Sequence, residues 1–156
     1  MTLMEIIDFE PRFADAFFGL NEAWVSRHFV MEAKDREVLG DPQGAIIDKG
    51  GFVFVAVGGD EAVGCCALMA MADGGFEIAK MAVADGFKGR GIGKALMAAC
   101  IDRARDVGAP RLYLESGSIL TPALTLYRAF GFQDLPPERR PVSPYARADV
   151  WMELLL

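Results

Sequence analysis

Histidine and cysteine, the side chains that most often hold transition metals, are scarce in this chain of 156 residues. The single histidine is His28, and the cysteines are Cys65, Cys66 and Cys100. Because these residues lack the paired spacing of a metal site, no metal is expected. An odd number of cysteines without such spacing indicates reduced thiols in a buried core, which favours a cytoplasmic protein.

Long apolar segments and an excess of basic residues are also absent. No stretch reaches the roughly 20 residues that cross a bilayer, and the N-terminus carries Glu5 and Asp8 where a secretory signal would be basic. Lysine and arginine number 16 against 22 aspartate and glutamate residues, which gives a net charge of −6. The chain therefore lacks the basic footprint of a nucleic-acid-binding protein, and neither nucleic acid nor a membrane is expected as a partner.

Residues 1–156 are predicted to form a single domain, because 53% of them are hydrophobic and no repeat or linker divides them. Apolar runs bounded by turn residues predict strands over 3–8, 52–57, 62–71, 76–83, 111–115 and 150–155. Apolar spacing and capping residues predict helices over 11–27, 42–49, 92–107 and 121–130. This order indicates an α/β fold with an antiparallel meander, one parallel crossover and a final hairpin.

The turn at residues 88–94 joins a strand directly to a helix. Its glycines, Gly89, Gly91 and Gly93, let a ligand approach the backbone closely, and the following helix directs its N–H groups and positive dipole end toward the turn. Further positive charge comes from Lys88, Arg90 and Lys94. This combination predicts a binding site for a phosphate group.

Three phosphate-binding motifs compete for this turn. A P-loop is excluded, because Ala95 stands where Ser or Thr would hold magnesium. The dinucleotide fingerprint fits Gly89 and Gly91 but then meets Lys94, while Glu115 lies near the distance expected of a ribose-binding acid. On spacing alone, the dinucleotide motif therefore remains a serious alternative to the third pattern.

The third pattern is Gln/Arg-x-x-Gly-x-Gly/Ala, which Lys88, Gly91 and Gly93 match with lysine in the first position. Here the sequence resembles the GNAT superfamily of N-acetyltransferases, whose members use this turn to bind the pyrophosphate of acetyl-coenzyme A. Residues 123–132, Ala-Leu-Thr-Leu-Tyr-Arg-Ala-Phe-Gly-Phe, resemble the family's Ala-x-x-Leu-Tyr-x-x-x-Gly-Phe segment. The dinucleotide interpretation does not predict this second segment.

The resemblance implies a GNAT-like α/β (α+β) fold, in which a mixed, mostly antiparallel sheet is flanked by helices and the strand 76–83, the helix 92–107 and the strand 111–115 form the parallel crossover. It also implies an enzyme that transfers the acetyl group of acetyl-coenzyme A to a primary amine of a small molecule or peptide within a ternary complex. The alternatives are a non-catalytic acyl-coenzyme A sensor and, less favoured, a dinucleotide-binding enzyme. The apolar final strand is compatible with a homodimer.

By position in the family motifs, Glu77 would be the base that deprotonates the amine, and Tyr127 the acid that protonates the leaving thiolate. Strand alternation places Glu77 on one face with Met81 and Val83, and Lys80 on the other. A solvated strand end for Glu77 and a packed aromatic for Tyr127 are the alternatives. The expected coenzyme contacts are Met81, Ala82, Val83, Lys88, Gly89, Arg90, Gly91, Ile92, Gly93, Lys94 and Tyr127.

One position departs from the family. Relatives often carry Asn seven residues before the tyrosine, where this chain has Leu120, so Ser118 or Thr121 would have to replace it. Candidate contacts to the acceptor amine are Trp24, His28, Lys80, Tyr145 and Arg147. Core packing, an ion pair or the polarity of an edge strand would explain these residues as well.

Overall fold

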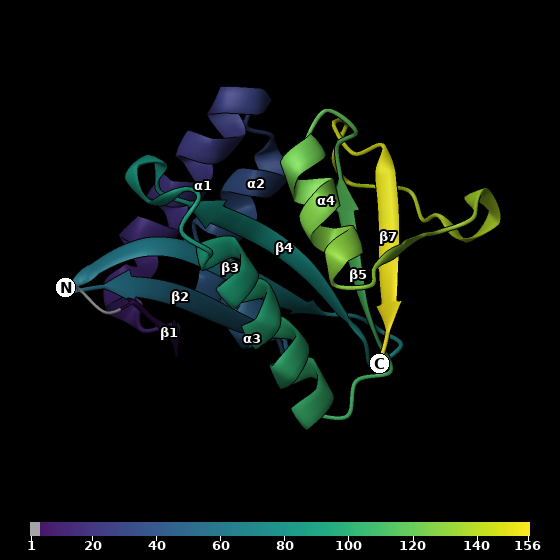
Figure 1. The fold of residues 1–156 in the computed structure, drawn as a ribbon, viewed down its shortest axis with the longest axis horizontal. Helices are drawn as coiled ribbons and strands as arrows, with labels where there is room; N and C mark the ends of the chain where they lie inside the picture. The colour runs from purple at the N-terminus through teal and green to yellow at the C-terminus, as the bar shows by residue number, and fades with distance from the viewer. Residues whose placement is uncertain (1–3) are drawn as a thin grey trace.

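A seven-stranded sheet forms the centre of the computed structural model, which describes residues 4–156 (Figure 1). Its order is β1-β2-β3-β4-β5-β7-β6, with β1 (Met4–Asp8), β2 (Phe52–Gly58), β3 (Glu61–Ala70), β4 (Phe76–Val83), β5 (Arg111–Ser116), β6 (Gln133–Asp134) and β7 (Val150–Leu155). Among these strands, β4 and β5 form the one parallel pair. The mostly antiparallel sheet with a parallel crossover is therefore confirmed, and residue 3, where the first strand was expected to begin, lies outside the described residues.

Helices cover both faces of the sheet (Figure 1). One face carries α1 (Ala14–His28) and α2 (Ala33–Leu39), and the other carries α3 (Ile92–Asp106) and α4 (Thr121–Ala129). Helix α2 was not predicted. A π-helical turn, Gln43–Ile47, replaces the helix expected over 42–49. Asp41 still acts as expected just before it, because its Oδ1 accepts a hydrogen bond from the N–H of Gly44 at 3.0 Å.

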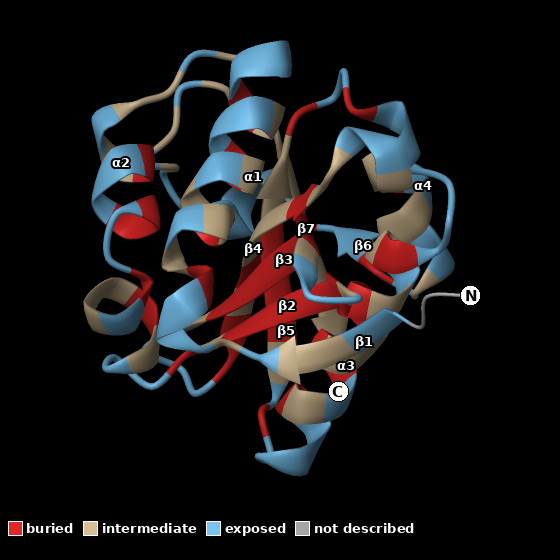
Figure 2. Cartoon of the chain, turned by 90° about the vertical axis from the view of Figure 1, so that its left-hand side faces the viewer, coloured by how far each residue is buried: buried red, intermediate tan, exposed pale blue. Residues whose placement is uncertain are grey.

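Two large apolar clusters and a smaller third one hold these layers together, and the buried residues concentrate along the central strands (Figure 2). As its spacing predicts, α3 buries one stripe against the sheet, formed by Ile92, Leu96, Cys100 and Ala104. On the opposite face, α1, α2 and the π-helical turn bury Phe17, Val38 and Ile46. The three cysteines are free and buried, with the Sγ atoms of Cys66 and Cys100 3.6 Å apart.

The parallel pair of strands is very short. Strands β4 and β5 pair at Phe76 with Leu112 and at Glu77 with Tyr113, and no further pairing between them occurs in the described structure. Beyond Glu77 the two strands diverge (Figure 1). Because each strand keeps its other neighbour in the sheet, the result is a wedge-shaped opening that exposes backbone groups of β4 to a ligand.

The final hairpin closes the far side of the sheet. Strand β7 lies between β5 and β6, and β6 pairs with Met152 and Glu153. The final strand is therefore not the outermost strand of the sheet. The homodimer stays a prediction, and its interface would have to use another surface or the part of β7 that β6 leaves unpaired. No helix in residues 4–156 has the length and apolar character required to cross a membrane.

Candidate functional site

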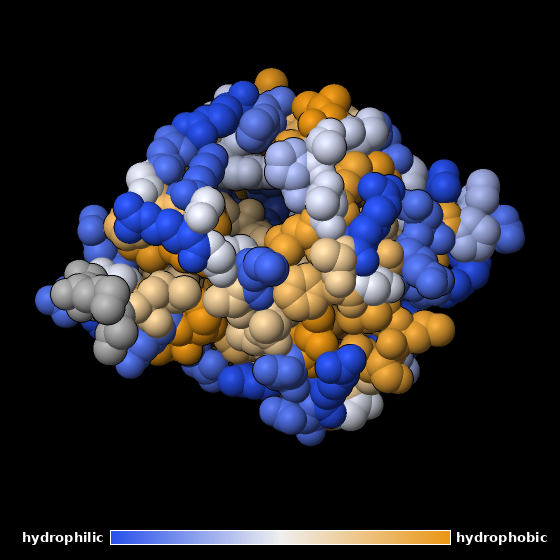
Figure 3. All heavy atoms as spheres, in the orientation of Figure 1, coloured by the Kyte–Doolittle hydropathy of each residue, from blue (hydrophilic) through white to orange (hydrophobic). Residues whose placement is uncertain are grey.

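Two adjoining cavities occupy the opening between β4 and β5, and Figure 3 shows a hollow in the surface between α1 and α4. We call the first the glycine groove; it is lined by Trp24, Met81, Ala82, Val83, Phe87, Lys88, Gly89, Gly91, Ile92, Gly93, Pro122, Ala123, Leu126 and Tyr127. We call the second the central pocket; it is lined by Asn21, Trp24, Val25, Phe29, Asp35, Glu77, Ile78, Ala79, Lys80, Met81, Glu115, Ser116, Gly117, Leu120, Tyr127, Tyr145, Arg147 and Ala148. The two cavities meet at the side chains they share, Trp24, Met81 and Tyr127.

The glycine groove is built to receive an anion. Gly89 and Gly91 have φ angles of +78° and +79°, a left-handed conformation that glycine adopts without strain, and no atom lies within 4 Å of a Cβ added at either position. No side chain in the described chain caps α3 at Gly91, so the N–H groups of its first turn are free for a ligand. These features fit a pyrophosphate.

Most of the expected coenzyme contacts lie together in this groove. Two basic residues of the turn do not line it. The Arg90 guanidinium lies 5.0 Å from the centre of the Phe87 ring, and Lys94 is exposed on α3. Both contribute charge near the groove, whereas Lys88 lines it and also pairs with Asp85 at 3.3 Å.

A β-bulge in β4 interrupts the strand alternation, so its side chains do not all face the sides that the sequence predicted. The register to β3 shifts between Cys65 and Ala67, and Lys80 adopts a φ of +57°. The extra residue moves Met81 and Val83 onto the α3 face, where they pack against that cluster. Lys80 and Glu77 consequently both enter the central pocket, so the prediction that Lys80 faces away from Glu77 was wrong.

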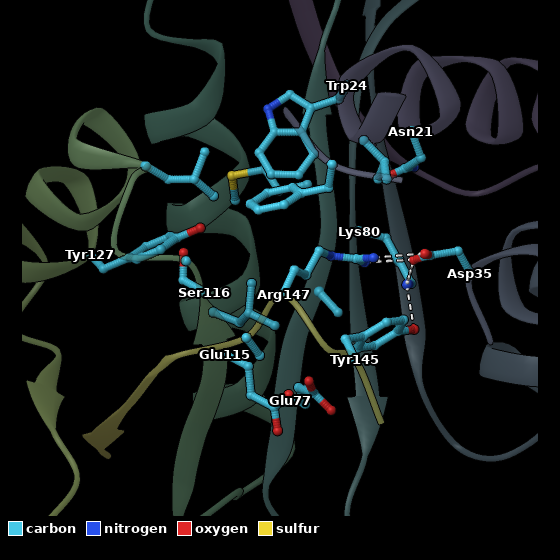
Figure 4. Close-up of a pocket in the computed structure, with 18 residues that line it drawn as sticks. Asn21, Trp24, Asp35, Glu77, Lys80, Glu115, Ser116, Tyr127, Tyr145 and Arg147 are labelled. Carbon is cyan, nitrogen blue, oxygen red and sulfur yellow. Dashed lines mark hydrogen bonds and ion pairs between the residues drawn. The ribbon is translucent and has the colours of Figure 1, made fainter. Parts of the chain in front are cut away.

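Two carboxyl groups lie at the same end of the central pocket, Glu77 on β4 and Glu115 on β5 (Figure 4). Glu115 accepts hydrogen bonds from Tyr113 Oη at 2.6 Å and from Ser143 Oγ at 2.5 Å. Burial and the nearby negative charge of Glu115 raise the pKa of Glu77 to about 7, although Lys80 acts in the opposite direction. A carboxyl group with this pKa can accept a proton near neutral pH.

This pKa can be tested by unfolding measurements. The folded protein keeps the Glu77 proton up to about pH 7, whereas the unfolded chain releases it near its ordinary value of about 4.3. Glu77 therefore contributes a loss of stability in the parent as the pH rises between these values, and Glu77→Gln lacks this contribution. The free energy of unfolding of each protein is measured with urea at pH 4 and at pH 8. We expect the difference, variant minus parent, to be about 1–3 kcal/mol larger at pH 8 than at pH 4. An equal difference at both pH values would contradict the raised pKa.

Tyr127, on α4, stands where the two cavities join. Its ring packs 6.2 Å from the ring of Phe132 between centroids, and Figure 4 shows its hydroxyl directed into the central pocket. Burial raises the pKa of this phenol to about 12. The hydroxyl therefore keeps its proton at neutral pH and is available as a hydrogen-bond donor.

An ion cluster forms another side of the central pocket (Figure 4). Asp35 is fully buried and accepts hydrogen bonds from Lys80 Nζ at 3.1 Å and from both Arg147 Nη atoms at 2.7 and 2.8 Å. Lys80 Nζ also donates to Tyr145 Oη at 2.7 Å. Outside the pocket wall, Arg147 Nη1 reaches Glu32 at 3.3 Å.

The opposite charges in this cluster stabilise one another in their ionised forms. Burial alone would raise the pKa of Asp35, but hydrogen bonds from Arg147 and the Glu32 backbone, with the charge of Lys80, bring it down to about 2. Burial lowers the pKa of Lys80, and Asp35 offsets part of that effect. Asp35 is therefore a carboxylate at neutral pH and fixes the position of both cations.

Other predicted residues lie outside the two cavities. His28 is exposed at the end of α1, 5.3 Å from Trp24 between ring centroids. Ser118, a proposed substitute for the family asparagine, donates from its hydroxyl to Asp149 at 2.7 Å, and Thr121 is exposed. Neither lines the glycine groove or the central pocket; the serine that lines the central pocket is Ser116.

Sequence reasoning missed Asp35 and assigned Glu115 only to the dinucleotide alternative. A signal for Asp35 was present: Glu32 and Asp35, three residues apart, form a capping box at the start of α2. Glu115 lies in the central pocket and not in the glycine groove, so it cannot serve as a ribose-binding acid beside that turn. No group of three metal-binding side chains gathers within residues 4–156.

The sequence matches the acetyltransferase (GNAT) family over residues 7–132. Streptothricin acetyltransferase from Streptomyces lavendulae is 41% identical over 81 residues, which make up 51% of this chain and only 43% of that protein. A GNAT-family acetyltransferase from Staphylococcus aureus Mu50 has the same fold, with a TM-score of 0.88 and 17% identity over 97% of this chain and 98% of the other. An acetyltransferase of Bacillus subtilis, solved in complex with CoA, has a TM-score of 0.70 and 20% identity over 100% of this chain and 99% of the other.

Proposed function

Because this chain belongs to the GNAT acetyltransferase family, we propose that it transfers the acetyl group of acetyl-coenzyme A directly to a primary amine of a small molecule or peptide. The observation that carries this proposal is the junction at Tyr127. There, a groove suited to a pyrophosphate meets a pocket that holds a carboxyl group with a pKa near 7. Such an arrangement brings a thioester and an amine together without a covalent enzyme intermediate.

The glycine groove would hold the coenzyme. The N–H groups at the start of α3 and the backbone around Gly89 and Gly91 suit its pyrophosphate, with Lys88 nearby. The unpaired edge of β4, at Met81, Ala82 and Val83, offers backbone groups to the pantetheine arm. Acetyl-coenzyme A supplies the activated acyl group as a thioester, and these contacts would direct that group toward Tyr127.

Glu77 would act on the amine. An alkylammonium ion must lose a proton before its nitrogen can form a bond to the acyl carbon. Glu77 accepts that proton, directly or through one water molecule, and the junction of the two cavities lets the free amine approach the thioester. Backbone N–H groups of β4 would stabilise the negative charge that develops on the carbonyl oxygen.

Tyr127 would complete the transfer. As the carbon–sulfur bond breaks, its phenolic proton passes to the departing thiolate. The nitrogen becomes positively charged when it bonds to the acyl carbon, and it loses its second proton to solvent. The products are then an acetylated amine and coenzyme A with a free thiol; the proton on Glu77 restores the phenol through solvent, so that one proton is released overall. This assignment agrees with the partly buried position of Tyr127 at the junction and with the raised pKa of its phenol.

Tyr127→Phe tests that role. The substitution keeps the ring that packs near Phe132 and removes only the oxygen, so the free energy of unfolding and coenzyme affinity should change little. Because a thiolate with a pKa near 8.5 leaves readily without help, we expect only about a 10- to 100-fold loss in kcat. Turnover equal to that of the parent, with chemistry shown to be rate-limiting, would reduce Tyr127 to a packing residue.

The alternative of a non-catalytic sensor would use the glycine groove but would not need Glu77 or Tyr127 for activity. An amine library with acetyl-coenzyme A separates the two functions: an enzyme releases coenzyme thiol and forms an acetylated product detectable by mass spectrometry, and a sensor does neither.

The dinucleotide alternative is excluded by the fold and the family. Calorimetry should accordingly show binding of acetyl-coenzyme A and no binding of NAD.

A further inference from the structure

The ion cluster beside Glu77 turns two cations but only one carboxylate toward the central pocket, because Glu32, the second carboxylate partner of Arg147, does not line it. Lys80 and Arg147 both line the pocket, and Asp35 is their one carboxylate partner within it. We propose that this cluster binds an anionic group of the acceptor, so that the substrate is an amine that also carries a carboxylate. The inference rests on the proposed acetyl transfer to an amine and specifies which amines are used.

The first argument is a count of hydrogen-bond donors. The Lys80 ammonium has three N–H donors and spends one on Asp35 and one on Tyr145. The guanidinium of Arg147 has five, of which three go to Asp35 and Glu32. In the described structure three donors have no partner: one N–H of Lys80, one N–H on Nη2 of Arg147 and the Nε–H of Arg147. Carboxylate is a group that charged donors of this kind bind strongly.

The second argument is the separation of charge along the pocket. Glu77 and Glu115 make one end acidic, which suits the ammonium form of an acceptor amine before Glu77 deprotonates it. Lys80 and Arg147 make the neighbouring wall basic. A diamine would place its second ammonium against those two cations, whereas an amino acid would match both ends.

The third argument is the backbone of Lys80. Its φ of +57° is unusual for any residue other than glycine, and conformations of this kind persist where the surrounding structure fixes them, often at binding sites. The bulge turns Lys80 into the pocket, where Tyr145 holds it with a hydrogen bond and with its ring, 4.5 Å from Nζ to the centroid. A solvated lysine on a regular strand would not need this arrangement, and the Lys80 side chain is only 7% exposed.

The experiment compares three acceptors of equal chain length: an ω-amino carboxylate, its carboxamide and the corresponding diamine, each in a series of three to six carbons. Acetylation is followed by coenzyme thiol release, and kcat/KM is measured for each. We expect the best amino carboxylate to exceed its carboxamide by about 10- to 100-fold, the effect of one charge-assisted hydrogen bond. The diamine should be poorer still.

Lys80→Met should reduce this preference to about threefold or less. Asp35 keeps both bonds to Arg147 in this variant, so the fold should survive. The matched control is Lys34→Met, which removes a partly exposed lysine of α2, outside the central pocket, that pairs with Glu37 at 3.5 Å and should leave the preference unchanged. Arg147→Lys, which keeps the charge but loses the fork of donors, should give an intermediate preference.

The outcomes separate the two proposals. If carboxamides or diamines are acetylated as well as the amino carboxylates, or if Lys80→Met keeps the preference, the carboxylate site is wrong and acetyl transfer to amines stands. If no amine of the series or of a broader library is acetylated although acetyl-coenzyme A binds, the proposed enzymatic function is wrong, and the substrate inference falls with it.

Discussion

Glu77→Gln should lower kcat by about 10²- to 10⁴-fold, the usual contribution of a general base, while the affinity for acetyl-coenzyme A stays the same. Glutamine has nearly the shape of glutamate but cannot accept the proton of the ammonium ion. Because Glu77 lies in the central pocket and outside the glycine groove, the substitution should not disturb coenzyme binding. Calorimetry with acetyl-coenzyme A and steady-state kinetics measure the two quantities separately.

The pH dependence makes this assignment specific. In the parent, kcat/KM should fall below about pH 7, where Glu77 becomes protonated. The variant should lack this limb, and Glu37→Gln, on the exposed surface of α2, should retain it. An identical acid limb in Glu77→Gln would mean that another group removes the proton. Glu115, the other carboxyl group at that end of the pocket, would then be the first residue to replace, ahead of the exposed His28.

Gly91→Asp should abolish coenzyme binding. The open space around Gly91 means that a new side chain would extend toward the groove without striking the protein, where its charge would meet the pyrophosphate. Loss of charge-assisted bonds together with repulsion should weaken binding by several kcal/mol, or more than about 100-fold in Kd. Calorimetry with acetyl-coenzyme A gives the affinity, and circular dichroism verifies that the variant is folded.

Two variants separate the charge from the strain of a side chain at positive φ. Gly91→Asn has nearly the shape of the aspartate variant but no charge, so it should lose less affinity. Gly108→Asp places the same charge on a glycine with φ of +76° and open surroundings just beyond the opposite end of α3, and it should bind coenzyme as the parent does. Unchanged affinity in a folded Gly91→Asp protein would refute the location of the coenzyme site.

The parts of this protein that could be predicted from sequence are those fixed by local rules. The turn at 88–94 and helix α3 follow from glycine positions and from apolar residues at helical spacing, and both occur as expected. The same holds for the strands of the meander, whose turns require glycine at Gly59 and Gly74, both with positive φ. In each case neighbouring residues contain the information.

The central pocket was less predictable because it depends on contacts between distant segments. Strand alternation is a local rule, and the bulge at Lys80 breaks it through the pairing of β4 with β3, which the sequence of β4 alone does not reveal. Asp35 lies 45 residues from Lys80 and 112 from Arg147. An acidic residue in a short polar helix resembles a solvated surface residue until the fold brings two cations to it.

The short pairing of β4 with β5 has a consequence for how the protein behaves in solution. Strands with free backbone groups at the rim of a sheet invite pairing with other chains and so promote aggregation. Here the free edge of β4 lies inside the sheet, because β5 rejoins it at Phe76 and Glu77. A slender ligand can reach these groups from one end of the wedge, while a foreign strand would have to fit between two strands that are already joined. The unpaired backbone groups of β4 can thus bind a ligand, while pairing with a strand of another protein molecule is hindered.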